Sequence, residues 1–174
     1  MASFAVDEEK MNQRDVSDLF HDTLINSTIS VELRDCHSID DYILQKLKKY
    51  EGKCLSGGYV KRDSIEVISR TLGKTNIYNN SSSIYYHIQF KASVMNPLKD
   101  EEISCIVQKQ NKMGILAVGE NNNPLRIIIA RQHHLEDVWE KNYDVKKGDN
   151  IRVTVVGTRF SINDNVISVI AKFK

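Results

Sequence analysis

EISCIVQK at residues 102–109, MGILAVGE at 113–120 and LRIIIAR at 125–131 predict three short β-strands in succession. In the first strand, Ile103, Cys105 and Val107 alternate with polar side chains, which is the pattern of a strand with one buried face. The connection that follows predicts a short amphipathic helical segment through its apolar residues Leu135, Val138 and Trp139. Two more strands are then predicted, with the sequences NIRVTVVGT at 150–158 and NVISVIAKF at 165–173.

Five short strands with one helical segment between the third and the fourth are typical of an OB-type barrel. We therefore predict an all-β five-stranded OB barrel over residues 98–174. Barrels of this type bind single-stranded nucleic acid on one face, so the fold itself indicates a class of ligand.

A second unit is predicted upstream, over residues 28–97, as an α+β domain of the order strand, helix, strands. Its helix is expected to begin after an N-cap at Ser38, with Asp41 in the capping-box position. The apolar stripe of this helix has spacings of three and four, at Ile39, Tyr42, Ile43, Leu47 and Tyr50. Strands are predicted at Thr28–Leu33, Ser64–Thr71 and Ile84–Met95, with a polar turn region at Gly73–Ser83 and a boundary at Asn96-Pro97.

The charge of the chain is unevenly distributed along the sequence. The net charge is +1, but residues 1–27 carry six acidic and two basic groups, whereas residues 28–97 carry ten basic and seven acidic groups. We treat residues 1–27 as an acidic N-terminal extension, either disordered or a short helix docked on a partner or on this chain. The helical alternative rests on the spacing of its apolar residues Val16, Leu19, Phe20 and Leu24.

No catalytic, metal or membrane motif is recognisable in the sequence. The chain has no glycine-rich phosphate loop and no paired C-x-x-C spacing, and the adjacent pairs Cys36-His37 and His133-His134 are poorly placed to share a metal. We expect no enzyme activity and no cofactor. We also expect no secretory signal and no membrane span, because no apolar run approaches the roughly 20 residues that a span needs.

The candidate RNA-binding residues lie on the strands and loops with which OB barrels hold their ligands. They are Lys109, Asn111, Lys112, Arg126, Arg131, His133, Arg159 and Phe160, with His134 beside them. Phe160 either stacks on a base or plugs the open end of the barrel, and the cations either neutralise phosphates or are simply solvated. An aromatic content of 7% favours weak, sequence-tolerant contact with RNA over tight binding.

Three local sequences add a resemblance to a known family. Glu51-Gly52-Lys53-Cys54 with Gly58-Tyr59-Val60, the run Phe90–Lys99 (FKASVMNPLK), and IIIARQHHL at Ile127–Leu135 resemble the larger stalk subunit of multisubunit DNA-directed RNA polymerases. This family comprises the eukaryotic seventh subunit and the archaeal E-prime subunit. The acidic extension and the shortened region between Tyr59 and Ser64 depart from its pattern, as a diverged version from a large DNA virus would.

The resemblance implies a non-catalytic subunit that docks on the polymerase core near the clamp and contacts emerging single-stranded RNA through its barrel. It assigns the docking to Gly57, Gly58, Tyr59 and Val60, whose alternative role is a simple turn with Tyr59 packed on its own domain. The implied partners are the polymerase core subunits. Most members of the family also pair with a small helical second stalk subunit, and whether this chain does is left open by the sequence. The implied location is inside the cell with the polymerase, in nucleus or cytoplasm, or in the virion of a virus. The competing hypothesis is a free-standing OB-fold RNA-binding adaptor in translation or RNA decay.

Overall fold

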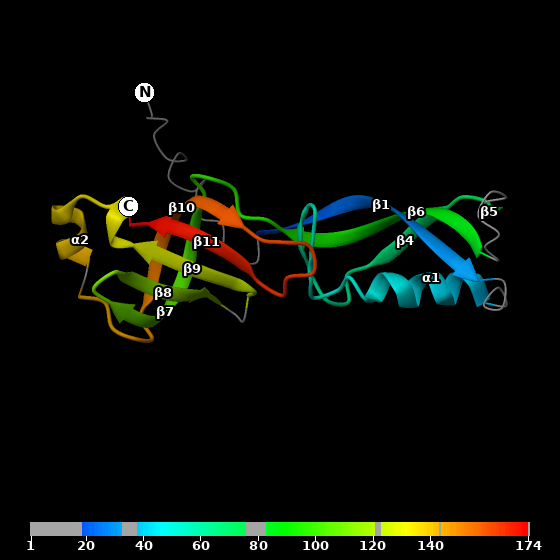
Figure 1. The fold of residues 1–174 in the computed structure, drawn as a ribbon. Helices are drawn as coiled ribbons and strands as arrows, with labels where there is room; N and C mark the ends of the chain where they lie inside the picture. The colour runs from blue at the N-terminus through cyan, green and yellow to red at the C-terminus, as the bar shows by residue number, and fades with distance from the viewer. Residues whose placement is uncertain (1–18, 33–37, 76–82, 121–122, 143, 174) are drawn as a thin grey trace, which may run out of the picture. The chain divides into compact units, whose positions relative to one another are not determined.

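The chain forms two compact units, each of which is described by itself (Figure 1). The computed structural model describes residues 19–32, 38–75, 83–120, 123–142 and 144–173. Within that part of the chain, the sheet unit contains Phe20–Asn96 and Arg159–Ile167. The barrel unit contains Pro97–Thr158 and the residues from Ser168 onward. Val16, Leu33, Cys36 and His37, which the sequence analysis names, lie outside the described residues.

The sheet unit is organised around one long central strand, β6 (Ser83–Met95). Along one edge β6 pairs antiparallel with β1 (Phe20–Glu32) over 13 residues, from Phe20↔Met95 to Glu32↔Ser83. Along the other edge it pairs in turn with β3 (Gly58–Val60), β4 (Glu66–Arg70) and β5 (Lys74–Thr75), while β2 (Cys54–Leu55) pairs with β3. The strand predicted at Ile84–Met95 is thus confirmed as β6, and its place at the centre of the sheet comes from the pairing.

The strand β1 corrects two expectations. It begins at Phe20 rather than Thr28, so Phe20–Ser27 is neither disordered nor helical, and Leu24 is an exposed strand residue. In the first half of β1, the inward positions include the polar residues Thr23 and Ser27. The alternation of apolar and polar side chains that marks a strand is therefore missing there. Similarly, Lys74–Thr75 is a short strand paired with β6, although a polar turn was expected there.

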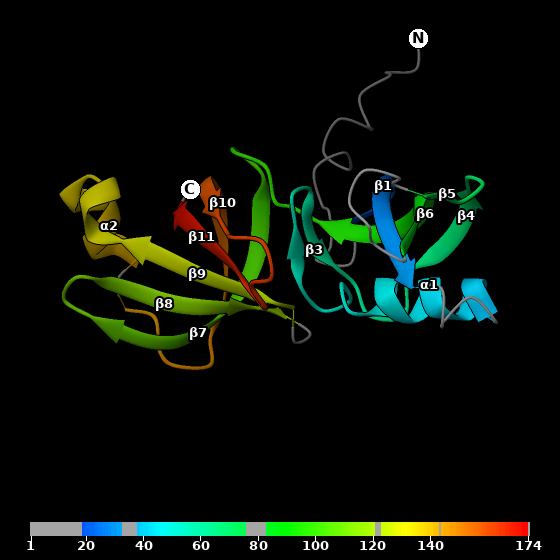
Figure 2. The same cartoon turned by 45° about the vertical axis from the view of Figure 1, so that its right-hand side comes forward.

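The helix α1 (Ile39–Lys48) covers the inner face of this sheet (Figures 1 and 2). Ser38 is its N-cap as predicted, but the Ser38 side chain makes no capping hydrogen bond, so the expected capping box is absent. Ile43 and Leu47 are buried against the sheet residues Val31, Ile88 and Phe90. Asp40 in the first turn forms an ion pair of 2.6 Å with Arg70 of β4, which ties the start of the helix to the sheet.

The barrel unit is a closed five-stranded mixed barrel, consistent with an OB-like barrel. Its strands are β7 (Glu102–Asn111), β8 (Gly114–Gly119), β9 (Leu125–Ala130), β10 (Asn150–Arg159) and β11 (Ile167–Lys172), in the order β10-β11-β9-β8-β7. Pairing of β10 with β7 closes the circle. The 3-10 turn Arg131–His133 and the helix α2 (Glu136–Asn142) connect the third and fourth strands, as the sequence predicts.

Inward and outward residues alternate along these strands as predicted. Ile103, Cys105 and Val107 of β7 are buried, and so are Val153 and Val155 of β10. Near the end of the β9–β10 connection, the N–H of Gly148 donates to the carbonyl of Val107 at 2.8 Å. The connection is thereby fastened to β7 where the pairing of β7 with β8 shifts register.

Candidate nucleic-acid interface and docking tip

Two of the candidate cations meet at one end of the barrel unit, in a pocket of about 360 Å³ lined by Lys112, Arg131, Trp139 and Glu140. Lys112 lies in the β7–β8 turn and Arg131 directly after β9. The two segments are joined by a hydrogen bond of 3.1 Å from the N–H of Arg131 to the carbonyl of Met113. The guanidinium of Arg131 is half exposed and lies 3.5 Å from the carboxylate of Glu136. The pocket thus presents two cations to an anion such as a phosphate, with the carboxylate residue Glu140 in the same lining.

His134, named with the candidate RNA-binding residues, has a structural role beside this pocket. The carbonyl of Ala130 lies 2.9 Å from its Nδ1, and the backbone N–H of Phe173 donates to its Nε2 at 2.8 Å. The second bond requires Nε2 to be an acceptor, so the proton of the neutral ring lies on Nδ1. The imidazole centroid lies 5.4 Å from that of Trp139 and 5.3 Å from that of Phe173. His134 therefore holds the last strand against α2.

Lys109 and Arg126 are exposed on the outer face of β7–β9, away from the pocket. Lys109 is in register with Leu116 and Arg126 with Val118, so apolar side chains lie between the two cations. Ile128, in register with Leu116, is 41% exposed on the same face. This face offers apolar surface for bases and two flanking charges for phosphates.

Asn111 has a structural role in a turn, and His133 is exposed at the end of one. The Oδ1 of Asn111 accepts hydrogen bonds from the N–H groups of Met113 and Gly114, at 3.0 and 2.9 Å, and so builds the β7–β8 turn. His133 ends the 3-10 turn with an exposed side chain. Asn111 therefore shapes the loop that carries Lys112, whereas His133 is free to meet solvent.

Arg159 and Phe160 belong to the sheet unit and not to the unit that contains Lys112 and Arg131. The segment that follows them is bonded to β2: the N–H of Cys54 donates to the carbonyl of Asp164 at 2.7 Å, and the N–H of Asn163 donates to the carbonyl of Cys54 at 2.9 Å. Arg159 is exposed and Phe160 is half-buried. The eight candidates therefore do not form one continuous site within either unit.

The proposed docking tip, Gly57–Val60, is partly used by the sheet itself. Val60 is fully buried, and Tyr59 and Val60 pair with Met95 and Val94 of β6. Gly58 is buried at φ +133°, and a Cβ built on it would lie 2.3 Å from the carbonyl oxygen of Met95. Only Gly57, exposed with open space around it, and the half-buried Tyr59 remain available to a partner.

The two buried cysteines, Cys54 and Cys105, are not reactive groups. Burial raises the pKa of the Cys54 thiol from 9.0 to about 11 and that of Cys105 to about 12, so both thiols are protonated and unreactive near neutrality. Among the residues that the structure describes, no three His, Cys, Asp or Glu side chains are grouped to hold a metal ion. None of the described helices is long and apolar enough to cross a membrane.

Three residues near the pocket were missed by the sequence analysis as site residues. Met113 is 79% exposed at the β7–β8 turn and Leu135 is 77% exposed before α2, so both can offer apolar contact to a base. Trp139 was expected only as a helix residue, yet it forms the buried wall of the pocket. The single tryptophan of the chain was the signal that could have identified this position.

Comparison with known proteins gives one relevant similarity. No family model matches the chain. The chain is 24% identical over 146 residues to a protein of Acanthamoeba polyphaga mimivirus named "Putative DNA-directed RNA polymerase subunit". The match covers 78% of this chain and 71% of the mimivirus protein. Since neither unit contains that large a share of this chain, the match includes residues of both units.

Proposed function

We propose that the chain is a non-catalytic stalk subunit of a DNA-directed RNA polymerase, diverged in the manner of a viral homologue. The similarity to the mimivirus protein is the observation that carries this proposal, because it supports a general polymerase-subunit role across both units. The stalk assignment is finer and rests on the sequence resemblance together with the order of the units, a helix-backed sheet followed by an OB-like barrel. Location with the polymerase inside the cell follows from the same role.

In this proposal residues 98–174 contact emerging RNA. The pocket of Lys112 and Arg131 takes a backbone phosphate, and the outer face of β7–β9, between Lys109 and Arg126, takes unpaired bases. Few cations are involved and one of them already has an acidic neighbour, Glu136. Binding should therefore be weak and tolerant of sequence, which suits a transcript that the core enzyme already holds.

Residues 28–97 provide the docking domain, and fewer residues of its tip can contact a partner than the sequence indicated. Gly57 and Tyr59 are the members of the tip that a partner can reach, since Gly58 and Val60 are packed within the sheet. A half-buried tyrosine beside an open glycine turn is a suitable anchor, because aromatic side chains often dominate interface energies.

The test compares tip variants by co-purification with the polymerase catalytic subunits. Tyr59→Ala and Gly57→Asp should each reduce the recovered core at least tenfold, since loss of an aromatic anchor costs about 2 kcal/mol or more. Lys48→Ala, an exposed change on α1, is the control and should leave recovery unchanged. Thermal melting of each purified variant should match the wild type. Full recovery of the core by the Tyr59→Ala, Gly57→Asp double variant would exclude the tip as the anchor.

The free-standing adaptor remains the second candidate, because a closed barrel with a cationic pocket would serve that role as well. It predicts recovery with ribosomes or nuclease complexes in place of polymerase. The same co-purification therefore separates the two functions.

A further inference from the structure

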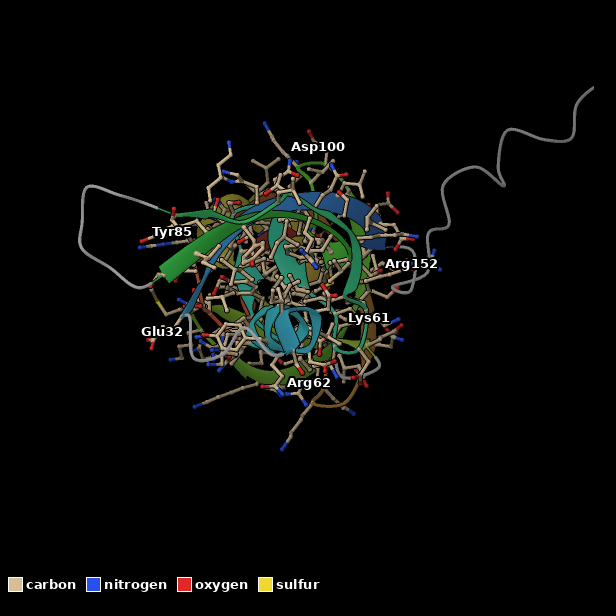
Figure 3. The ribbon with its side chains drawn as sticks, turned by 90° about the vertical axis from the view of Figure 1, so that its right-hand side faces the viewer. Glu32, Lys61, Arg62, Tyr85, Asp100 and Arg152 are labelled. Atoms are coloured by element: carbon tan, nitrogen blue, oxygen red, sulfur yellow. The ribbon has the colours of Figure 1, made fainter. Side chains whose placement is uncertain are left out.

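The solvent face of the sheet unit carries a second groove, whose lining includes none of the candidate residues above. It has a volume of about 450 Å³ and lies across β1, β6 and β4. This volume is within the range of about 300–1,000 Å³ typical of ligand sites. Six of its lining residues have side chains on the face opposite to α1, which Figure 3 shows end-on beneath the sheet: Asn26, Thr28, Ser69, Thr71, His87 and Gln89. The other three, Ser27, Arg70 and Ile88, alternate with these along the strands and belong to the α1 face.

The groove is built from two rows of side chains that run across the three strands. One row contains Asn26, Gln89 and Ser69, since Gln89 is in register with both of the others. The second row contains Thr28, His87 and Thr71. Asn26, His87, Ser69 and both threonines are exposed, and Gln89 is half-buried.

The second row is fixed by internal hydrogen bonds, whereas the first is left open. Thr28 Oγ1 lies 2.9 Å from His87 Nδ1, and the N–H of His87 donates to Thr71 Oγ1 at 3.0 Å. Because Nδ1 is used, the Nε2 edge of the ring is the one available to a ligand. Within the described part of the chain, the side chains of Asn26, Gln89 and Ser69 have no hydrogen-bond partner. The groove therefore offers two amides, a hydroxyl and an oriented imidazole.

We propose that this groove binds unpaired bases of single-stranded nucleic acid. Asn and Gln amides present a donor and an acceptor side by side, which matches the edge of a base. His87 and Tyr85 lie two residues apart in β6 and so place two planar rings on the same face of the strand, where successive bases can stack. An extended peptide would instead add to the edge of a sheet, where backbone hydrogen bonds are available.

Charge around the groove complements a polyanion. Lys74 is in register with Tyr85 at one end, and Lys91 follows Gln89 on the same face at the other, where it is paired with Asp22 at 2.7 Å. The sheet unit, Phe20–Asn96 with Arg159–Ile167, carries eleven basic and nine acidic groups, so its net charge of +2 gives a small attraction for phosphates. This site does not depend on association with a polymerase, because all its residues belong to one unit of this chain.

The test is NMR of the isotopically labelled full chain during titration with RNA 12-mers of uridine or adenosine. The side-chain amide signals of Asn26 and Gln89 and the ring signals of His87 should shift with these strands. They should not shift with an abasic strand of the same length, which has the phosphates without the bases. Unmoved signals, or equal shifts with the abasic strand, would overturn the proposal. Equal shifts with adenosine monophosphate at the same concentration would also overturn it, in favour of a free-nucleotide site.

Variants add a quantitative arm to this test. His87→Ala should weaken RNA binding at the groove, read from the side-chain amide signals of Asn26 and Gln89, at least about fivefold, since stacking on one ring contributes about 1–3 kcal/mol. His87→Phe, which keeps a planar ring, should stay within about twofold of the wild type. His21→Ala removes another exposed histidine of the same sheet, outside the groove, and serves as the control. Equal affinities for the His87→Ala and His21→Ala variants would contradict stacking on His87.

Discussion

Replacing Gly58 by alanine should break the pairing of β3 with the central strand β6. Gly58 has φ +133°, and a Cβ there would lie 2.3 Å from the carbonyl oxygen of Met95 and 2.9 Å from the Cβ of Asn96. The nearest obstacle is backbone, so β3 must move away from β6. The movement separates Tyr59 from Met95 and exposes Val60, which is fully buried.

The expected loss of stability combines two costs. A side chain forced into this backbone region costs about 1–3 kcal/mol, and exposing a buried valine costs about 1.5–3 kcal/mol. We therefore expect Gly58→Ala to lower the free energy of unfolding by about 3 to 5 kcal/mol, a large part of the 5–15 kcal/mol typical of a domain. Gly57→Ala is the matched control: a Cβ at Gly57 meets nothing within 4 Å, so the change should stay within about 0.5 kcal/mol.

The assay is urea denaturation followed by far-UV circular dichroism, with hydrogen exchange at the amides of β3 as the local readout. Gly58→Ala should accelerate exchange at Val60, whose N–H donates to the carbonyl of Lys53 at 2.9 Å. A Gly58→Ala chain within about 1 kcal/mol of the wild type, with unchanged exchange at Val60, would refute the close approach of β3 and β6. The result also bears on docking, because a Gly58 variant would lose partners by unfolding its own sheet.

Three further predictions concern the barrel and the buried thiols. His134→Ala should destabilise the barrel by about 1–3 kcal/mol through loss of its hydrogen bonds to Ala130 and Phe173, as read from Trp139 fluorescence, whereas the exposed His133→Ala should not. Combined Lys112→Ala and Arg131→Ala changes should flatten the dependence of log RNA affinity on log salt by about 1.4, at roughly 0.7 per phosphate contact, and an unchanged slope would exclude the pocket. Burial raises the pKa of Cys54 to about 11 and that of Cys105 to about 12, above the ordinary 9.0. The free energy of unfolding should therefore keep the whole contribution of the two protonated thiols below pH 9, and lose it as the pH rises toward the raised pKa values. At pH 8 iodoacetamide should leave both thiols unmodified until urea unfolds the chain, and rapid labelling of either in the native chain would contradict its burial.

The sequence predicted the elements whose side chains alternate cleanly. The barrel strands and β6 were located because their buried positions are occupied by apolar residues such as Ile103, Val107 and Phe90. The first half of β1 was missed because Thr23 and Ser27 face inward while Leu24 faces solvent, which is the reverse of the expected pattern. The pairing with β6 over 13 residues decides the structure there, and this long-range contact leaves no local mark.

The sequence named candidate binding residues one by one but did not indicate how they are arranged in space. The meeting of Lys112 with Arg131 depends on a backbone bond between the β7–β8 turn and the residue after β9, which spacing alone does not reveal. Arg159 was grouped with these cations because it begins the predicted loop between the fourth and fifth barrel strands, yet the segment that begins with it packs with the sheet unit. Gly58 was read as a point of approach for a partner, whereas the chain's own Met95 occupies that approach.

The most direct test of the central claim is native mass spectrometry of assemblies purified through an affinity tag on this chain. The account predicts one copy of this 19.9 kDa chain per pair of polymerase catalytic subunits, and loss of that assembly in the Tyr59→Ala, Gly57→Asp double variant. Recovery of the chain alone, or with ribosomes or nuclease complexes and without the catalytic subunits, would contradict its role as a polymerase subunit.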